Sequence, residues 1–329
     1  MTPAAGSRIV RGSRFPPAPA RRGPSGDLPL SEDPEFRRDF TPDYGAVVAV
    51  SPLIRRVVAR NPGPFTFMGT GTYIVGRGRV AVIDPGPADR AHVAALVAGL
   101  GDEVVSHILV THTHRDHSPA TPLLQAARPA LSHGFGPHGG AESGRGDGPV
   151  EEGADHDFAP DRPMGEGDVV AGPGWTLEAV HTPGHTSNHL CFRLREENAL
   201  FSGDHVMGWS TTVVSPPDGD MGAYMASLEK VRGLGCARFW PTHGSPIEEP
   251  GRFVRALIGH RRQRERQILD CLADGTADIP AMVVRLYRAI DPRLHKAAGR
   301  SVLAHLVDLE RRGVVAADGT TWRMAGPSG

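Results

Sequence analysis

Short apolar runs that end in glycine, proline and a histidine or aspartate recur along this chain and constrain its fold more than any other feature. The segment Thr111–His117 places three histidines and one aspartate directly after the apolar run Ile108–Val110. The same pattern returns at four further segments: Asp84–Gly86, His181–Thr186, Ser202–His205 and Pro241–Gly244. Apolar runs of about four to eight residues bounded by turn residues are typical of buried strands. If these strands are neighbours, their end loops gather at one sheet edge, where functional sites are commonly built.

Strand-like and helix-like segments alternate through most of the chain. The expected strands cover residues 46–50, 53–58, 106–110 and 237–240, three short strands between 175 and 204, and a hairpin of 71–76 with 80–84. Apolar spacing predicts helices over 89–100, 119–127, 221–234 and about 252–272. The glycines from Gly69 to Gly78 lack the Gly-Lys-Ser/Thr ending of a phosphate loop, so we interpret them as turn residues. This alternation indicates a layered α/β structure.

We divide the chain into four parts. Residues 1–40 are rich in Pro, Gly and Arg and are predicted to be a disordered arm, and 41–250 form the layered domain. Residues 251–274 are a connecting basic helix. In 275–329, a helix capped by Thr276 and reaching about 290, a helix over 294–312 and a hairpin at Asp318–Gly319 resemble a winged helix. Residues 134–168 read as a long loop with a mobile centre, so His133, His138 and His156 are expected at the surface.

Composition excludes several classes of protein. The formal net charge is -1, so no global field attracts nucleic acid or a membrane. Cys191, Cys236 and Cys271 form no Cys-x-x-Cys pair, which favours reduced thiols in a cytoplasmic protein. No apolar run approaches the roughly 20 residues that span a bilayer, and the N-terminal segment lacks the apolar stretch of a secretory signal. We therefore expect a cytoplasmic protein without a membrane partner.

The histidine-rich segments carry the chemistry. Imidazole nitrogens and carboxylate oxygens are the donors that bind Zn²⁺ or a similar borderline cation. A polar loop with accidental histidines could explain Thr111–His117 alone. It does not explain the further ligand-type residues at His185, Asp204 and His243. The sequence therefore predicts a metal site at one edge of the sheets.

The order of these motifs resembles the metallo-β-lactamase superfamily over about residues 47–250. The motifs are His-x-His-x-Asp-His at 112–117, Thr-Pro-Gly-His-Thr at 182–186, Ser-Gly-Asp at 202–204 and a late His-Gly at 243–244. Gly69–Tyr73 and the helical tail are similar to the branch of beta-lactamase-like protein 2. The resemblance implies an αββα sandwich, with two mixed β-sheets flanked by helices, followed by a small C-terminal winged-helix domain.

The resemblance also implies a dinuclear ligand set. One metal would take His112, His114 and His185, the other Asp116, His117 and His243, and Asp204 would bridge the two. Asp84 and His189, with His205 as a further candidate, would orient the ligands through hydrogen bonds. His181 is the alternative to His185, but it ends the preceding strand. Two Zn²⁺ ions are expected, with manganese or iron left open.

The implied activity is hydrolysis of an ester-type bond by a metal-bridging hydroxide, with Asp116 and Asp204 guiding its proton. The main expectation for the substrate is single-stranded RNA. From Arg252 onward the chain has 14 Lys and Arg against 8 Asp and Glu, and such a basic tail could hold phosphates. The alternative is a small-molecule ester or thioester, as in hydroxyacylglutathione hydrolases and acyl-carrier thioesterases. A β-lactamase or a non-enzymatic nucleic-acid-binding protein is a weaker candidate.

Overall fold

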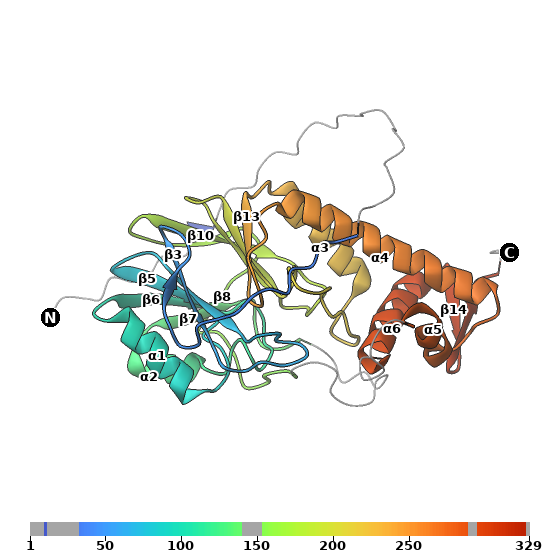
Figure 1. The fold of residues 1–329 in the computed structure, drawn as a ribbon, viewed down its shortest axis with the longest axis horizontal. Coiled ribbons are helices and arrows are strands. Elements are labelled where there is room, and N and C mark those ends of the chain that lie inside the picture. Colours follow the sequence, from blue (N-terminus) through green and yellow to red (C-terminus); the bar gives the residue numbers. More distant parts are fainter. Residues whose placement is uncertain (1–9, 12–32, 140–152, 289–294, 327–329) are drawn as a thin grey trace.

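The computed structural model describes residues 10–11, 33–139, 153–288 and 295–326 of the chain. Two mixed β-sheets lie face to face, with helices on their outer faces and a helical module at one end (Figure 1). The predicted αββα sandwich is therefore confirmed. Most of the predicted disordered arm, residues 1–40, and the centre of the predicted mobile loop, residues 134–168, lie outside the described residues.

The first sheet has seven strands in the order β2 to β8. Their bounds are β2 Val48–Ala49, β3 Ile54–Val58, β4 Gly71–Val75, β5 Arg79–Ile83, β6 Val104–Leu109, β7 Leu131–Gly134 and β8 Arg162–Pro163. Strands β2 to β5 are antiparallel and β5 to β8 are parallel. Helices α1 (Arg90–Leu100) and α2 (Thr121–Ala127) cover its outer face. The side chain of Asp89 accepts a hydrogen bond from Ala91 N and so caps α1.

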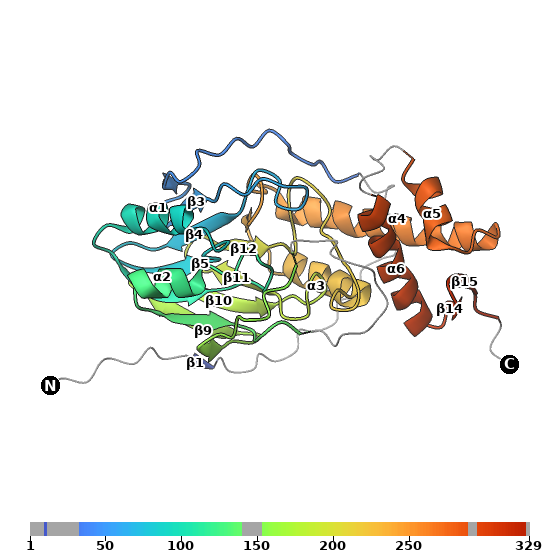
Figure 2. The same ribbon diagram turned by 90° about the horizontal axis from the view of Figure 1, so that it is seen from below.

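The second sheet has six strands in the order β1, β9, β10, β11, β12, β13. Their bounds are β1 Val10–Arg11, β9 Asp168–Gly172, β10 Trp175–His181, β11 Leu190–Leu194, β12 Ala199–Gly203 and β13 Arg238–Pro241. Only β12 and β13 pair in parallel among these strands. Helices α3 (Met221–Gly233) and α4 (Pro250–Ala273) cover the outer face, and α4 extends beyond the sandwich into the C-terminal helices (Figure 2).

Alternation of side chains along the central strands builds the layers. On β4 and β5, Tyr73, Ala81 and Ile83 point into the core between the two sheets. Their neighbours Ile74 and Val82 pack under α1 and α2 instead. Successive side chains of a strand point to opposite faces of the sheet. Because both faces are buried here, these runs are continuously apolar.

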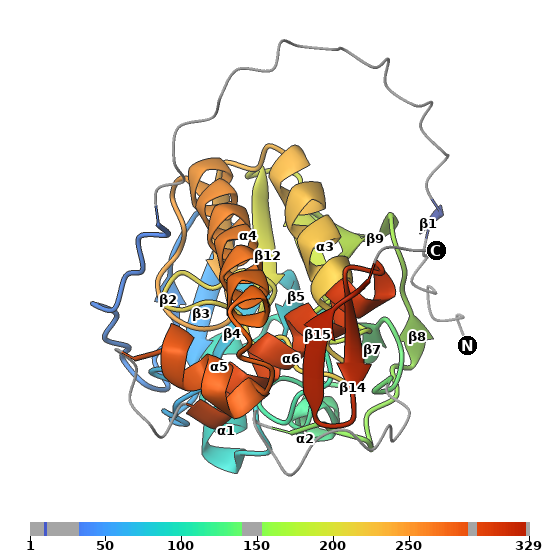
Figure 3. The ribbon, with the colours of Figure 1, turned by 90° about the vertical axis from the view of Figure 1, so that its right-hand side faces the viewer.

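The C-terminal module, which faces the viewer in Figure 3, has its own apolar core. It contains α5 (Ile279–Leu286), α6 (His295–Arg311) and the hairpin of β14 (Val315–Asp318) with β15 (Thr321–Met324). The second helix and the hairpin were predicted correctly. The predicted cap was wrong, because Asp278 rather than Thr276 precedes α5 and accepts a hydrogen bond from Ala281 N. The helix also ends at Leu286, earlier than predicted.

Of the three histidines expected at the surface, His133 was placed wrongly. It lies on β7 with no exposed surface, and its ring centroid is 5.1 Å from that of His107. His138 is partly buried and only His156 is exposed. The error arose because His133 belongs to a strand of the parallel sheet and not to the loop that follows. Among the described residues, no helix is both long and apolar enough to cross a membrane.

Candidate metal centre

Five strand ends meet at one edge of the sandwich. Asp84 follows β5, the segment His112–His117 follows β6, His185 lies between β10 and β11, Asp204 follows β12, and His243 follows β13. The structure brings together all seven predicted ligands, each of which exposes at most 7% of its surface. Their donor atoms form three groups in which all atoms lie within 4.8 Å of one another. The groups are His112, His114, His185; His112, His117, Asp204; and Asp116, His117, His243.

Hydrogen bonds at the far side of the rings aim these imidazoles at the centre. The Nδ1 atom of His185 lies 2.6 Å from the carbonyl oxygen of Val213, and that of His243 lies 3.1 Å from the carbonyl oxygen of Gly69. His117 Nδ1 is 2.9 Å from Asp84 Oδ2. Carbonyl and carboxylate oxygens accept hydrogen bonds and do not donate them, so each of these Nδ1 atoms carries a proton. Each Nε2 therefore faces the cluster and is the atom that a cation would take.

The spacing of the inward atoms fits a cation. His114 Nδ1 lies 3.0 Å from His112 Nε2 and 3.1 Å from His185 Nε2, so three ring nitrogens face one another. Asp204 Oδ1 is buried and makes no hydrogen bond with any described residue, although it lies 3.4 Å from His243 Nε2. Buried polar atoms without partners are costly, and a shared cation would satisfy both arrangements. The donor set of imidazoles and carboxylates is one that zinc, iron or manganese accepts.

Electrostatics divide the cluster into two halves. Burial, reinforced by the neighbouring histidines, holds the pKa of His112 and of His114 well below its usual range, so both rings are neutral. Burial would also lower the pKa of His243, but Asp204 and Asp116 outweigh it and raise that pKa to about 10. The same two carboxylates and Asp84 raise the pKa of His117. In the metal-free protein, protons therefore occupy the carboxylate half of the cluster, and a metal must displace them.

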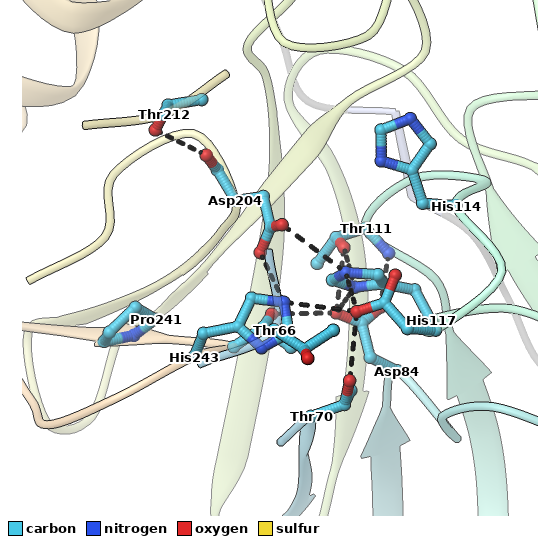
Figure 4. A network of polar contacts seen from close by, with 12 residues as sticks. Thr66, Thr70, Asp84, Thr111, His114, His117, Asp204, Thr212, Pro241 and His243 are labelled. Atoms are coloured by element: carbon cyan, nitrogen blue, oxygen red, sulfur yellow. Dashed lines mark hydrogen bonds and ion pairs between the residues drawn. The ribbon is translucent and has the colours of Figure 1, made fainter. Parts of the chain in front are cut away.

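Asp84 ties three of the converging strand ends together, as Figure 4 shows. Its carboxylate accepts hydrogen bonds from Thr111 N and Thr111 Oγ1, both at 2.8 Å, and from Thr242 Oγ1 at 3.2 Å, in addition to His117 Nδ1. Its backbone φ is +50°, a left-handed conformation that aspartate tolerates better than most residues. Asp84 touches the ligand His117 from outside the cluster, the position expected of an orienting carboxylate.

The other predicted supporting residues fall in two places. His189 Nε2 accepts a hydrogen bond from Asp204 N at 3.2 Å, so it holds the backbone that carries Asp204. His205 is fully buried and its ring lies 5.0 Å from that of Tyr224, away from the inward-facing ligand atoms. His181, the alternative to His185, stacks on Phe135 and its Nε2 is 3.0 Å from the carbonyl oxygen of Ser187. The structure thus brings His185, and not His181, into the cluster.

Two supporting residues were missed by the sequence analysis. Thr70 Oγ1 donates to Asp116 Oδ2 at 3.0 Å. Arg56 is buried on β3, and its guanidinium donates to the carbonyl oxygens of Thr242 and Gly244, at 2.8 and 2.6 Å, on either side of His243. An arginine within a predicted strand was the available signal for the second residue. Nothing in the sequence pairs it with a turn that lies almost two hundred residues away.

The cluster opens into a cavity of about 560 Å³ that continues to the C-terminal module. Its side walls are largely apolar and include Phe65, Phe67, Met207 and Trp209. Phe67 and Trp209 stack with ring centroids 4.8 Å apart. A volume of this size accommodates a small-molecule ligand or one arm of a larger substrate.

Residues 65–243 match the metallo-beta-lactamase superfamily, and residues 279–322 match the beta-lactamase associated winged helix domain. The chain belongs to the metallo-beta-lactamase superfamily. It is 37% identical over 235 residues to the atrochrysone carboxyl ACP thioesterase AgnL7 of Paecilomyces divaricatus, covering 70% of this chain and 68% of that protein. It is 35% identical over 267 residues to an atrochrysone carboxyl ACP thioesterase of Aspergillus fumigatus, covering 77% and 78%.

Solved structures support the same architecture. A beta-lactamase domain protein from Burkholderia ambifaria superposes with a TM-score of 0.74 at 21% identity, covering 89% of this superfamily member and 97% of that chain. A metallo-beta-lactamase family protein from Thermus thermophilus gives a TM-score of 0.68 at 22% identity, covering 84% and 100%. Identity at this level shows the fold alone. Together with the curated relatives, the superfamily assignment identifies the chain as a hydrolase with a C-terminal winged helix, as predicted.

Proposed function

We propose that this superfamily member is a metal-dependent thioesterase that hydrolyses an acyl group from a carrier-protein or pantetheine thiol. The observation that carries the proposal is its identity of 35 to 37% with two proteins named as ACP thioesterases over 70% or more of the chain. Thioester hydrolysis was the alternative expectation from the sequence. The main expectation, cleavage of single-stranded RNA, has no support from these relatives.

The proposed metal ligands are those implied by the sequence motifs. His112, His114 and His185 would hold one ion. Asp116, His117 and His243 would hold the second, and Asp204 would lie between the two. We propose zinc because the donors are mainly imidazole nitrogens. When bound, such ions supply a Lewis acid for the carbonyl oxygen and lower the pKa of water to about 7.

The protein's own groups position the reactants. Burial would raise the pKa of Asp116, but His117 and His243 lower it, so this carboxylate stays ionised and its Oδ2 accepts from Thr70. The pKa of Asp204 is also held well below its usual range, chiefly by His243 against the effect of burial. Such carboxylates are weak bases but good acceptors. They orient the attacking water through its hydrogens rather than take its proton fully.

The reaction balances without a further co-reactant. The water oxygen forms a bond to the thioester carbonyl carbon, the C–S bond breaks, and the thiol leaves with one proton of the water. A thiol has a pKa of about 8.5, so it departs with little help from an acid. This matches a site in which Asp116 and Asp204 are held ionised and so cannot act as acids. The apolar side walls of the cavity would hold the acyl group during the attack.

A parallel assay tests the proposal. Zinc-loaded protein is incubated with an acyl-pantetheine, an acyl carrier protein thioester, single-stranded RNA and a β-lactam, and thiol release is followed colorimetrically. We expect thiol release that a chelator abolishes and added zinc restores. Asp157→Asn, a change at an exposed aspartate, is the matched control and should behave as wild type. Cleavage of RNA without thiol release from either thioester would contradict the proposal.

A further inference from the structure

The cavity wall opposite the metal centre is basic and comes from the C-terminal helices. We call this wall, formed by His260, Arg261, Arg264 and Tyr287, the arginine wall. Among the residues that the structure describes, neither Arg261 nor Arg264 forms an ion pair with a carboxylate. Their neighbours on the same surface are paired: Arg262 lies 3.5 Å from Glu229, and Arg312 lies 2.5 Å from Glu265. Among the described residues, Arg261 and Arg264 line the cavity without such a partner, as Arg38 does.

One side of the Arg264 guanidinium is held by protein contacts, and an N–H donor of the group remains without an acceptor among the described residues. Its Nη1 donates to the carbonyl oxygen of Leu286 at 3.2 Å, and its guanidinium carbon lies 4.1 Å from the centre of the Tyr287 ring. Its Nε is buried and has no hydrogen-bond partner in the described structure. A guanidinium stays protonated at any working pH, so a buried N–H without an acceptor is costly. Arg264 is therefore preorganised to receive an acceptor from the cavity.

Arg261 plays a different part in the same wall. It exposes only 3% of its surface. Its guanidinium donates to the carbonyl oxygen of Thr212 and, at 3.3 Å, to Ser301 Oγ. Those bonds occupy both Nη atoms, and its Nε, like that of Arg264, is buried without a hydrogen-bond partner among the described residues. Because its Nη atoms are held by the protein, Arg261 mainly adds positive charge beside Arg264.

The positive charge of these arginines also affects the pKa of the nearby histidines. Burial, with Arg261 and Arg264 adding to it, lowers the pKa of His305 to about 3 and that of His260 to about 4. Asp33 opposes this shift at His260 but has a smaller effect than burial and the two arginines. The cavity therefore has two electrical ends, with Asp116 and Asp204 at one and unneutralised arginines at the other.

We propose that Arg264 binds an anionic group of the substrate, at the end of the cavity opposite the metal centre. The proposal rests on the thioesterase function proposed above and adds a specificity determinant to it. A carboxylate or a phosphate matches the guanidinium fork in charge and geometry. Two parts of a thioester substrate can bring such a group: the phosphate of a pantetheine arm, or an acidic group on the acyl chain. Phe67 and Trp209 would then cover the uncharged part between the two ends.

Four substrates distinguish the two sources. Glutaryl and hexanoyl groups, one with a terminal carboxylate and one without, are each carried on coenzyme A, which has phosphates, and on N-acetylcysteamine, which has none. For wild type we expect a preference of about tenfold in kcat/KM for the anionic member of one pair. A preference within the acyl pair places the acyl acid at Arg264, and a preference within the thiol pair places the phosphate there.

Variants assign the preference to Arg264. In Arg264→Gln the ratio of anionic to neutral substrate should fall towards one, and Arg264→Lys should keep part of it, because lysine retains the charge but loses the fork. Arg266→Gln is the matched control, since Arg266 is exposed on the same helix and its substitution removes the same charge. It should keep the wild-type ratio. An unchanged ratio in Arg264→Gln, or no preference in wild type for either anion, would overturn the proposal.

A binding measurement separates this proposal from the thioesterase function. Glutarate and coenzyme A are titrated into the metal-loaded protein by calorimetry, with Trp209 fluorescence as a second signal because that ring lines the cavity. If no thioester is hydrolysed, the proposed function fails. The anion site still stands when one probe binds at least tenfold more weakly to Arg264→Gln than to Arg266→Gln. Equal affinity in the two variants, or no binding of either probe to wild type, would contradict the proposed anion site.

Discussion

A buried and a partly buried group of histidines and charged residues line two ends of one cavity, and their partners decide what each can bind. In the metal centre, Asp116 and Asp204 raise the pKa of His243 to about 10. In the arginine wall, burial and two arginines lower the pKa of His260 to about 4. The residue type is the same, and the neighbouring charge is opposite. One end is therefore built to take a cation and the other an anion.

The two ends are also mechanically connected. Arg261 reaches from α4 to the carbonyl oxygen of Thr212, and Thr212 Oγ1 donates to the carbonyl oxygen of Asp204 at 2.8 Å. The next residue, Val213, accepts the Nδ1 hydrogen bond of His185. From α6, Arg300 Nε donates to Ser215 Oγ at 3.0 Å. The C-terminal helices therefore brace the loop that hydrogen-bonds to two of the proposed ligands. Breaking either end of the cavity tests the comparison between them.

The largest effect is expected from Asp204→Asn. The amide removes the negative charge that lies between the two proposed ion positions, so both should be lost. We expect thioesterase activity to fall on the order of a thousandfold or more. Elemental analysis should show less than half of the wild-type metal content, with Asp157→Asn as the control. A variant with full metal content and normal turnover would show that Asp204 does not bridge two ions.

We expect a smaller loss of activity and metal affinity from Asp84→Asn than from Asp204→Asn. Asp84 contacts His117, Thr111 and Thr242 but not the inward face of the cluster, so the ligands stay present and lose their alignment. Changes at residues that orient metal ligands typically cost about 10- to 100-fold in affinity or activity. Metal affinity, measured by competition with a chelator, checks this. A loss as large as that of Asp204→Asn would mean that Asp84 itself contacts an ion.

Arg261→Met tests the brace. The methionine keeps much of the buried volume and removes both donors, leaving Thr212 O without one. We expect a loss of about 1.5–3 kcal/mol in unfolding free energy and a fall of roughly tenfold in kcat, because the loop that holds Asp204 and His185 loosens. Denaturant unfolding and steady-state kinetics measure the two. Arg255→Met, at an exposed arginine of the same helix, should change neither.

The strand-end motifs made the metal centre and the sandwich predictable. Each motif follows a run whose side chains alternate between two buried faces, and parallel strands such as β5 and β6 deliver Asp84 and His112 to the same edge. The residues that hold the motifs in place were not predictable. Arg56 and Arg261 act on turns and loops remote in sequence, and only the packing of β3 and α4 brings them there.

The charge of the tail misled the choice of substrate for a physical reason. A count of Lys and Arg says nothing of where they point. Arg262, Arg285 and Arg312 are paired with carboxylates, whereas Arg261 and Arg264 face the cavity. The excess positive charge that suggested nucleic acid includes an interior wall. Local sequence also misplaced the cap of α5, because Thr276 and Asp278 are both good caps and only packing selects between them.

The smallest expected effect is that of acidic pH, which should change the stability of the two ends of the cavity differently. His305 has a folded pKa of about 3 against about 6.5 in an unfolded chain, so its contribution to stability is complete above pH 6.5. As the pH falls from 6.5 towards 3, the unfolded state takes up protons that the fold excludes, and the C-terminal module weakens. His243 in the metal-free protein behaves oppositely. Its contribution is complete below pH 6.5 and is lost as the pH rises through about 10.

Hydrogen exchange of the metal-free protein at pH 6.5 and 4.5 measures this difference, with rates corrected for intrinsic exchange. Protection in α6 should fall at the lower pH, whereas the raised pKa of His243 predicts no loss of stability from that residue over this range. His305→Leu should abolish most of the acid response of α6, because neither ring nitrogen of His305 has a hydrogen-bond partner to lose among the described residues. His156→Leu, at an exposed histidine, should leave the response intact. An acid response of α6 that is the same in His305→Leu as in wild type would mean that the protonation of His305 does not control the stability of this helix.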